Sequence, residues 1–204
     1  MPDPRSVLAF PAAYRLFGRV VGGDGSRTSF VRDHLKPRPG DRILDLGCGP
    51  GSLLPYLPAC DYVGVDLDPS YIAAAKARFP DRGSFRCEAA ETVAEVEAGS
   101  FDLVVASGLL HHLTDEQAVA TMGVARRALR PGGRFVSLDG CFVPGQHWFA
   151  RWMLRRDRGE YVRDLPAYRA LADRVFPTVT EAVRHDLLRV PYTLLILDCT
   201  TAGG

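Results

Sequence analysis

The sequence predicts one α/β domain whose sheet is mostly parallel and is closed by an antiparallel hairpin. Short apolar runs alternate with stretches able to form helices, which is the pattern of a parallel sheet. The last two apolar runs, about Val179 to Asp186 and Tyr192 to Cys199, have no helix between them, so we expect them to pair through a turn near Val190-Pro191. The length of 204 residues allows one sizeable core but hardly two ordinary domains.

Five apolar runs are the predicted parallel strands, and helix signals separate them. The runs are Ile43 to Leu46, Tyr62 to Val65, Ser84 to Cys87, Phe101 to Ala106 and Phe135 to Leu138. Asp68 before Pro69 is an N-cap followed by proline in the first turn, and Thr114 to Gln117 is a capping box for a helix that runs towards Leu129. The stretch Arg130 to Gly133, which contains proline and two glycines, predicts the end of this helix before the fifth strand.

Composition and charge exclude several classes of protein. With 47% hydrophobic and 24% charged residues, the chain is in the globular range. A net charge of +1 disfavours a dedicated nucleic-acid binder. The five cysteines are scattered without a C-x-x-C pair, and no segment resembles a signal peptide or a membrane span. We therefore expect a soluble, cytoplasmic protein with no nucleic-acid partner and no stable membrane insertion.

A glycine-rich turn after the first predicted strand is the strongest chemical signal. Gly47, Gly49 and Gly51 alternate directly after an apolar run, and glycines supply positive φ angles and let a ligand approach the backbone. A helix starting near Leu53 would add free N–H groups. Asp66 ends the next strand, where a carboxylate can accept both hydroxyl hydrogens of a ribose.

The spacing of these residues distinguishes between cofactors. A dinucleotide-binding turn has the pattern G-x-G-x-x-G, whereas this chain has G-x-G-x-G preceded by Asp45. The motif resembles the first motif of the class I S-adenosylmethionine-dependent methyltransferases. The resemblance covers roughly residues 40 to 140 and continues through four further places in order: Val65 to Pro69, Cys87 to Ala90, Phe101 to Leu113 and Leu129 to Arg134. It implies a three-layer Rossmann-like fold with a mostly parallel, seven-stranded sheet and a C-terminal antiparallel hairpin.

The resemblance also implies how S-adenosylmethionine is held. The three glycines would lie under its methionine part and Asp45 would support the amino group. Asp66 would hold the ribose, Leu67 would pack on adenine, and Glu88 with the Ala89 backbone would read the adenine edge. The full predicted cofactor set is Asp45, Gly47, Gly49, Gly51, Asp66, Leu67, Glu88, Ala89 and Ser107.

Candidate catalytic residues follow the fourth and fifth predicted strands. Ser107, His111, His112 and Asp139 are expected just beyond strand ends, at the carboxyl edge where α/β folds bind ligands. His112 is the first candidate for a general base because an imidazole titrates near neutrality, and Asp139 is the second. Alternatively, one imidazole packs or caps, and Asp139 caps a turn with Gly140. The adjacent histidines lack the spacing of a metal site, so no metal is expected.

Two segments outside the core are candidates for covering the acceptor. The connection after the fifth strand contains Trp148, Arg151, Trp152 and Tyr161, and the N-terminal segment contains Tyr14. Arg27 has a similar status as a possible carboxylate contact. The alternative is that the tryptophans are core and the arginines a solvated face. The domain therefore divides into N-terminal cap helices (1–35), a cofactor-binding core (40–140), an acceptor lid (141–176) and a C-terminal hairpin (177–204).

The predicted function is transfer of a methyl group from S-adenosylmethionine to a small-molecule acceptor, with oxygen as the first candidate atom. A lipid or quinone acceptor is a variant that the aromatic and basic lid would suit. A second class is a protein that binds the cofactor but catalyses another reaction, and an NAD-dependent dehydrogenase is a third that the glycine spacing disfavours. A monomer or a homodimer is expected.

Overall fold

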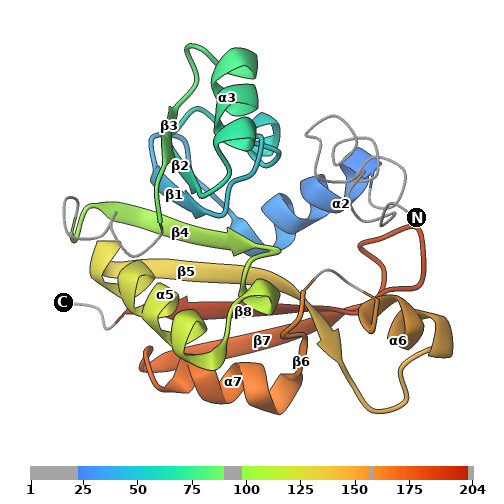
Figure 1. Ribbon diagram of the computed structural model, residues 1–204. Coiled ribbons are helices and arrows are strands. Elements are labelled where there is room, and N and C mark those ends of the chain that lie inside the picture. The colour runs from blue at the N-terminus through green and yellow to red at the C-terminus, as the bar shows by residue number, and fades with distance from the viewer. Residues whose placement is uncertain (1–22, 90–97, 157–158, 202–204) are drawn as a thin grey trace.

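The computed structural model describes residues 23–89, 98–156 and 159–201, and its central feature is a mixed sheet (Figure 1). The strand order is β3-β2-β1-β4-β5-β8-β7. The strands on this path are β1 (Arg42–Leu46), β2 (Asp61–Asp66), β3 (Ser84–Cys87), β4 (Phe101–Ser107), β5 (Leu129–Phe142), β7 (Thr178–Arg184) and β8 (Leu194–Thr200). The first five are parallel to one another, and β8 is antiparallel to both β5 and β7. The predicted fold class and C-terminal antiparallel pair are confirmed.

Helices and one short strand complete the described part of the chain. They are α2 (Gly23–Phe30), the π-helix η2 (Val31–Leu35), the 3-10 helices η3 (Leu54–Tyr56) and η4 (Leu110–His112), α3 (Pro69–Arg78), α5 (Asp115–Ala128), α6 (Trp148–Leu154), β6 (Arg163–Asp164) and α7 (Leu165–Asp173). β6 pairs with the end of β5, opposite Cys141 and Phe142. The predicted sheet of seven strands therefore carries an additional two-residue strand. None of the described helices is both long and apolar enough to cross a membrane.

Side chains from both faces of the sheet form two apolar cores. Along β1, Ile43 packs with Phe30 and Leu35 of the N-terminal helices, whereas Leu44 packs in a second cluster that includes Met122 of α5 and Tyr168 of α7. This alternation follows from the two-residue period of a strand. Helices therefore cover the sheet on both sides, and the carboxyl ends of the parallel strands are left to form a site.

The two predicted helix starts are confirmed. The Asp68 carboxylate accepts hydrogen bonds from the backbone N–H groups of Ser70 and Tyr71, with Pro69 in the first turn. Thr114 and Gln117 make both bonds of a capping box, at 3.3 and 3.0 Å. These local signals work because each cap supplies an acceptor for N–H groups that have no partner inside the helix.

The fifth strand is longer than predicted. Asp139 therefore lies within the strand, whereas it was expected just beyond the strand end. Helix α5 ends at Ala128, as the stretch Arg130 to Gly133 predicted, but that stretch itself lies inside β5, where a register shift between Phe101 and Leu103 of β4 absorbs the extra residues. At its other end β5 continues to Phe142 because β8 pairs with it as far as Gly140 and β6 pairs with Cys141 and Phe142. Asp139 and Gly140 are therefore strand residues, and neither belongs to a turn.

The connection after β1 also differs from the prediction of a helix starting near Leu53. No α-helix follows the glycine-rich turn; the chain makes only the 3-10 helix η3 before β2 begins at Asp61. Pro55 and Pro58 explain this, since each lacks a backbone N–H and restricts the residue before it. The predicted helix N-terminus is therefore not formed between residues 47 and 60, and the turn's own backbone is the candidate ligand contact here.

Candidate functional site

The glycine-rich turn is bound to the end of β2. The backbone N–H groups of Gly47 and Cys48 donate to the Val65 carbonyl, at 2.9 and 3.0 Å, and the N–H of Gly49 donates to the Asp66 carboxylate at 2.8 Å. Gly49 has a φ of +54°, which favours glycine, and a Cβ placed on it would meet nothing within 4 Å. The turn is thus fixed in place, and open space lies in front of Gly49.

The other two glycines of the turn have neighbours. A Cβ on Gly47 would come within 3.1 Å of the Leu109 side chain, and one on Gly51 would come within 3.0 Å of the Phe79 ring. Gly47 lines the cavities described below, as Gly49 does, whereas Gly51 lines neither of them. Gly51 therefore allows the turn to pack against Phe79. The prediction that it contacts the cofactor has no support from the cavity linings.

A cavity of about 480 Å³ lies between this turn and the loop after β4. Its lining residues are Gly47, Gly49, Val65, Asp66, Leu67, Tyr71, Glu88, Ser107, Gly108, Leu109, His112, Leu113 and Thr121. Six of the nine predicted cofactor residues are in this lining: Gly47, Gly49, Asp66, Leu67, Glu88 and Ser107. Leu67 is 73% exposed, which leaves its side chain available to pack on a flat ring. Ala89 is partly buried and is not part of the lining.

Asp66 is oriented by the backbone. One of its carboxylate oxygens accepts from Gly49 N–H and the other from Asp68 N–H, at 2.8 and 2.9 Å. Each carboxylate oxygen can accept a second hydrogen bond, so both oxygens keep acceptor capacity towards the cavity. Beside it, the Glu88 carboxylate is 3.8 Å from the Arg86 guanidinium.

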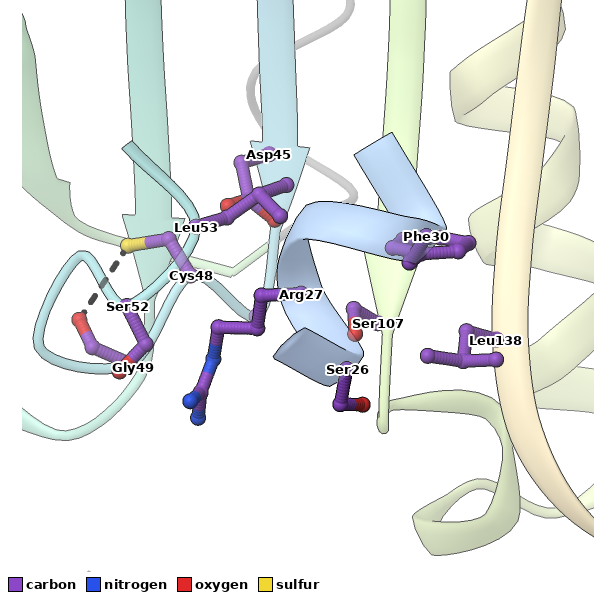
Figure 2. A pocket seen from close by; sticks show the side chains of 11 residues that line it. Ser26, Arg27, Phe30, Asp45, Cys48, Gly49, Ser52, Leu53, Ser107 and Leu138 are labelled. Atoms are coloured by element: carbon purple, nitrogen blue, oxygen red, sulfur yellow. Dashed lines mark hydrogen bonds between the residues drawn. The ribbon is translucent and has the colours of Figure 1, made fainter. Parts of the chain in front are cut away.

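A smaller cavity, of about 80 Å³, lies on the other side of the turn, against α2 (Figure 2). Its lining residues are Ser26, Arg27, Phe30, Asp45, Gly47, Cys48, Gly49, Ser52, Leu53, Ser107 and Leu138. The Arg27 side chain extends from α2 towards Gly49 and Ser52 in Figure 2. Gly47, Gly49 and Ser107 line both cavities, so the two spaces adjoin at the glycine-rich turn.

Asp45 is a buried carboxyl group at the smaller cavity. It accepts a hydrogen bond from the Tyr62 hydroxyl at 2.7 Å. Burial raises the pKa of Asp45 to about 7, although the bond from Tyr62 opposes that rise. Tyr62 reaches it because Gly64, opposite Asp45 in the β1–β2 pair, has no side chain; a Cβ there would come within 3.0 Å of the Tyr62 ring. Tyr62 was not predicted as a site residue, and the available signal was Gly64, two residues after it.

A histidine and an aspartate meet where β4 and β5 end their pairing. The Nδ1 atom of His111 is 2.8 Å from Asp139 Oδ1, and the same oxygen accepts from the His111 backbone N–H at 3.2 Å. Both side chains are buried, and Asp139 Oδ2 has no hydrogen-bond partner in the part of the chain that the structure describes. His111 is thus the imidazole bonded to Asp139. His112, the predicted base, is exposed, lines the larger cavity and has its ring centroid 4.2 Å from that of His111.

The segment after α6 closes over His111. The Tyr161 backbone N–H donates to the His111 carbonyl at 3.0 Å, and a Cβ on Gly159 would come within 2.1 Å of the His111 ring. Arg163 fastens the same region, because its guanidinium donates to the carbonyls of Leu110 and Leu113 and to Asp115. These contacts join η4 to residues some 50 positions away, so sequence spacing gave no signal for Arg163.

The predicted lid residues lie apart from the two cavities. Trp148, Arg151 and Trp152 are on α6 and exposed, and Tyr161 is exposed beside the His111 loop. None of the four lines either cavity. Tyr14 lies outside the described residues.

Comparisons with known proteins agree with this geometry. Residues 44–137 match the methyltransferase domain family. An uncharacterized methyltransferase of Synechocystis is 33% identical over 136 residues, covering 64% of this chain and 63% of that protein. A ubiquinone biosynthesis O-methyltransferase of Idiomarina loihiensis is 31% identical over 147 residues, covering 65% of this chain and 58% of that protein. The alignments thus span about three fifths of the length of these relatives.

Solved structures share the fold. A phosphoethanolamine N-methyltransferase of Haemonchus contortus, solved in complex with S-adenosyl-L-methionine, has a TM-score of 0.76 at 16% identity and covers 99% of this chain and 60% of that one. A TehB-like S-adenosylmethionine-dependent methyltransferase of Corynebacterium glutamicum has a TM-score of 0.69 at 21% identity, over 98% and 100% of the two chains. Residues 44–137 thus match a methyltransferase domain, and the motifs and strand order around them are similar to those of the class I S-adenosylmethionine-dependent methyltransferases.

Proposed function

We propose that this protein transfers a methyl group from S-adenosylmethionine to an oxygen atom of a small-molecule acceptor, with His111 as the general base. The observation that carries the proposal is the pair of adjoining cavities, which have different chemistry and meet at Gly47 and Gly49. A ligand with an amino acid at one end and a nucleoside at the other fits this division.

The smaller cavity fits the amino acid end. Arg27 forms no ion pair with another residue in the described ranges, and its guanidinium suits an α-carboxylate. Asp45 is a buried acceptor for an α-ammonium group. The Arg27 guanidinium and the ionised form of the Asp45 carboxyl group carry opposite charges and approach the cavity from different elements, α2 and β1, as a zwitterion requires.

The larger cavity fits the nucleoside end. The Asp66 carboxylate, held by two backbone N–H groups, is available to two ribose hydroxyls. The exposed Leu67 offers an apolar surface to adenine, and Glu88 lies in the same lining for the adenine edge. The Ala89 backbone and Ser107 complete the predicted set.

When bound, the cofactor supplies a methyl group that its sulfonium has already activated. The residues of this chain must then align the acceptor, exclude water and remove a proton if the acceptor has one. The side chains of Leu109 and Leu113 give the larger cavity apolar walls, and Gly49, in front of which there is open space, leaves room at the meeting point of the two cavities.

His111 and Asp139 are the pair that we propose takes that proton; both are buried and line neither cavity, so the acceptor must reach the His111 ring past the neighbouring His112, which does line the larger one. In the proposed reaction the acceptor hydroxyl gives its proton to Nε2 of His111 while its oxygen bonds to the methyl carbon. Asp139 accepts the Nδ1–H of His111, which selects the tautomer with a basic Nε2 and stabilises the imidazolium that forms. This assigns Asp139 a positioning role behind His111. His112, the first candidate for the base from sequence, lines the larger cavity. A substitution of His112 is therefore the comparison for substitutions of His111.

An oxygen acceptor is favoured because a hydroxyl must lose a proton on methylation, so it makes use of such a base. The similarity to proteins named as ubiquinone biosynthesis O-methyltransferases points in the same direction. A quinol-like acceptor is therefore the first to try.

Product analysis tests the proposal. Purified protein is incubated with methyl-labelled cofactor and a panel of phenols and quinols, and both products are quantified. We expect S-adenosylhomocysteine and a methyl ether in equal amounts, and greater loss of product with His111→Ala than with His112→Ala. Turnover of an acceptor without S-adenosylhomocysteine would show that the protein uses the cofactor for another reaction.

A further inference from the structure

Helix α6 displays a row of aromatic rings on the protein surface. Trp148 is 72% exposed and Trp152 is 43% exposed. The ring centroids of Trp148 and Phe149 are 5.7 Å apart, those of Phe149 and Trp152 are 5.6 Å apart, and His147 stacks on Trp148 at 5.8 Å. Large apolar side chains grouped in this way on a surface mark a place of interaction.

The exposure of this row does not come from a loosely attached helix. Ala150 and Leu154, on the opposite face of α6, are buried. Leu154 packs so closely on β5 that a Cβ on Gly140 would come within 2.6 Å of it. The helix is therefore fixed to the sheet by its inner face, and its aromatic face is directed outward.

Three arginines accompany the aromatic row. Arg151, Arg155 and Arg156 are exposed, and none forms an ion pair with another residue in the described ranges. The Arg156 guanidinium lies 4.4 Å from the centre of the Trp152 ring, and Arg151 lies 5.6 Å from that of Phe142. The row and these arginines are called the α6 surface: His147, Trp148, Phe149, Arg151, Trp152, Arg155 and Arg156. Glu160 is the exposed acidic residue in the described part of the connection that follows.

The α6 surface lies at the same sheet edge as the candidate site. Helix α6 follows the carboxyl end of β5, and Figure 1 shows it beyond the ends of the strands, on the side towards which β4 and β5 point. The glycine-rich turn and Asp66 also lie at the carboxyl ends of their strands. A partner bound to the α6 surface would therefore face the edge that carries the site.

We propose that the α6 surface binds the headgroup region of an anionic lipid bilayer, with α6 lying in the plane of the membrane. Tryptophan rings are favoured at the membrane–water interface, and exposed arginines are attracted to anionic headgroups. The whole chain has a net charge of only +1, so the attraction is local to this surface. The inference goes beyond the proposed function, since it requires neither the cofactor nor a particular acceptor.

A groove beside α6, lined by both apolar and polar side chains, the latter including Gln146, His185 and Arg189, offers space for part of a lipid. It has a volume of about 520 Å³ and lies between the start of α6 and residues 185–193. His147 and Ala150 line it from the helix, and Val143, Leu188 and Pro191 are among its apolar members. The groove thus continues from the aromatic row.

The tryptophans themselves supply the test. Both tryptophans of the chain, Trp148 and Trp152, belong to the α6 surface, so tryptophan fluorescence, excited selectively over that of the seven tyrosines, reports on this surface alone. The protein is mixed with vesicles of phosphatidylcholine and phosphatidylglycerol, and with vesicles of phosphatidylcholine only. We expect a blue shift and quenching by bromine-labelled lipid with the anionic vesicles, and weaker binding as salt increases.

Matched variants show whether these residues cause the binding. Arg155→Gln/Arg156→Gln removes two charges from the α6 surface, whereas Arg127→Gln/Arg174→Gln removes two exposed charges near the C-terminal ends of α5 and α7. Each basic residue near an anionic surface strengthens binding about fivefold, so we expect the first variant to bind roughly 25-fold more weakly and the second to bind almost as the original protein does. Trp148→Ala/Trp152→Ala should also reduce co-sedimentation with vesicles.

Three results would overturn the proposal. One is the absence of any fluorescence shift or co-sedimentation with anionic vesicles. Another is equal weakening by the two arginine pairs, which would mean that the attraction is not specific to the α6 surface. The third is a concentration-dependent dimer that Trp148→Ala/Trp152→Ala dissociates while vesicles are not bound, which would assign the surface to a second copy of the chain. Circular dichroism of each variant confirms that it is folded.

Discussion

On the β1–β2 side of the sheet edge, the site consists of residues 45 to 67, which are near one another in the sequence. On the β4–β5 side, His111, Asp139 and Arg163 come from three separate segments. The first side is held largely by backbone hydrogen bonds, such as those from Gly49 and Asp68 to Asp66. The second is held by side chains. A sequence motif can therefore describe the β1–β2 side of the site. The β4–β5 side depends on contacts that exist only in the assembled fold.

The largest expected effect is on the β4–β5 side. Asp139→Asn keeps the size of the side chain but removes the charge that orients His111 and stabilises its protonated form. We expect turnover to fall by roughly 10²- to 10⁴-fold, as on loss of general-base catalysis, with cofactor affinity unchanged. Steady-state kinetics with a methylated-product assay measures the first quantity, and calorimetry measures the second.

His112→Ala is the matched control for that experiment. If its turnover falls as far as that of Asp139→Asn while His111→Ala remains active, His112 is the base and the assignment of His111 is wrong.

The β1–β2 side contains a carboxyl group whose ionisation affects stability. The folded-state pKa of Asp45 is about 7, above the value of about 3.9 for an unfolded chain. The folded protein therefore holds the proton more tightly, and the stability that Asp45 contributes is present below about pH 4 and is lost as pH rises through 7. The loss amounts to about 4 kcal/mol at most by pH 8.

Asp45→Asn removes this pH dependence. We expect the variant to gain stability relative to the original protein between pH 5 and 8, measured by urea unfolding, while it binds S-adenosylhomocysteine more weakly at pH 8. Gains in both stability and affinity would contradict the role of Asp45 as acceptor for the α-ammonium group.

Asp66→Ala tests the nucleoside end. Loss of charge-assisted hydrogen bonds should weaken cofactor binding by about 1.5 to 3 kcal/mol. Asp68→Ala, in the next turn, is the comparison: it removes the α3 cap and should cost about 1 kcal/mol of folding stability with little effect on affinity. Unchanged affinity in Asp66→Ala would exclude the ribose contact.

The smallest effect concerns the contacts that hold η4. Arg163→Gln breaks the bonds to Leu110 and Leu113, and we expect about tenfold lower kcat through displacement of His111. Thr114→Ala, which removes the α5 cap next to the same loop, should cost about 1 kcal/mol of stability and leave kcat almost unchanged. Equal kcat in Arg163→Gln and the original protein would show that Arg163 is not a positioning residue.

The same division explains how far the sequence could predict the structure. The caps at Asp68 and Thr114 were predicted and are present, and Gly49 and Asp66, two predicted cofactor residues, line the larger cavity; all four depend mainly on nearby parts of the sequence. The extension of β5 was not, because the prolyl-glycyl stretch Arg130 to Gly133 is typical of a turn, and only pairing with β4 and β8 keeps it in a strand.

The β4–β5 side required contacts that spacing does not encode. Ser107 lies opposite Leu138, and this register brings the His111 loop to Asp139. Each residue was a candidate from sequence, but their pairing was not foreseen. The tryptophans of α6 show the same limit, since the outward direction of their helix face follows from the packing of Leu154 on β5.

Calorimetric titration tests directly whether the two cavities bind S-adenosylmethionine with Asp66 at the ribose. Cofactor-free protein is titrated with S-adenosylmethionine, S-adenosylhomocysteine and NAD, and the same titrations are repeated with Asp66→Ala. We predict micromolar binding of the first two ligands, none of NAD, and a marked loss of affinity in the variant. Binding of NAD alone, or binding of S-adenosylhomocysteine that Asp66→Ala leaves unchanged, would contradict the account of the two cavities.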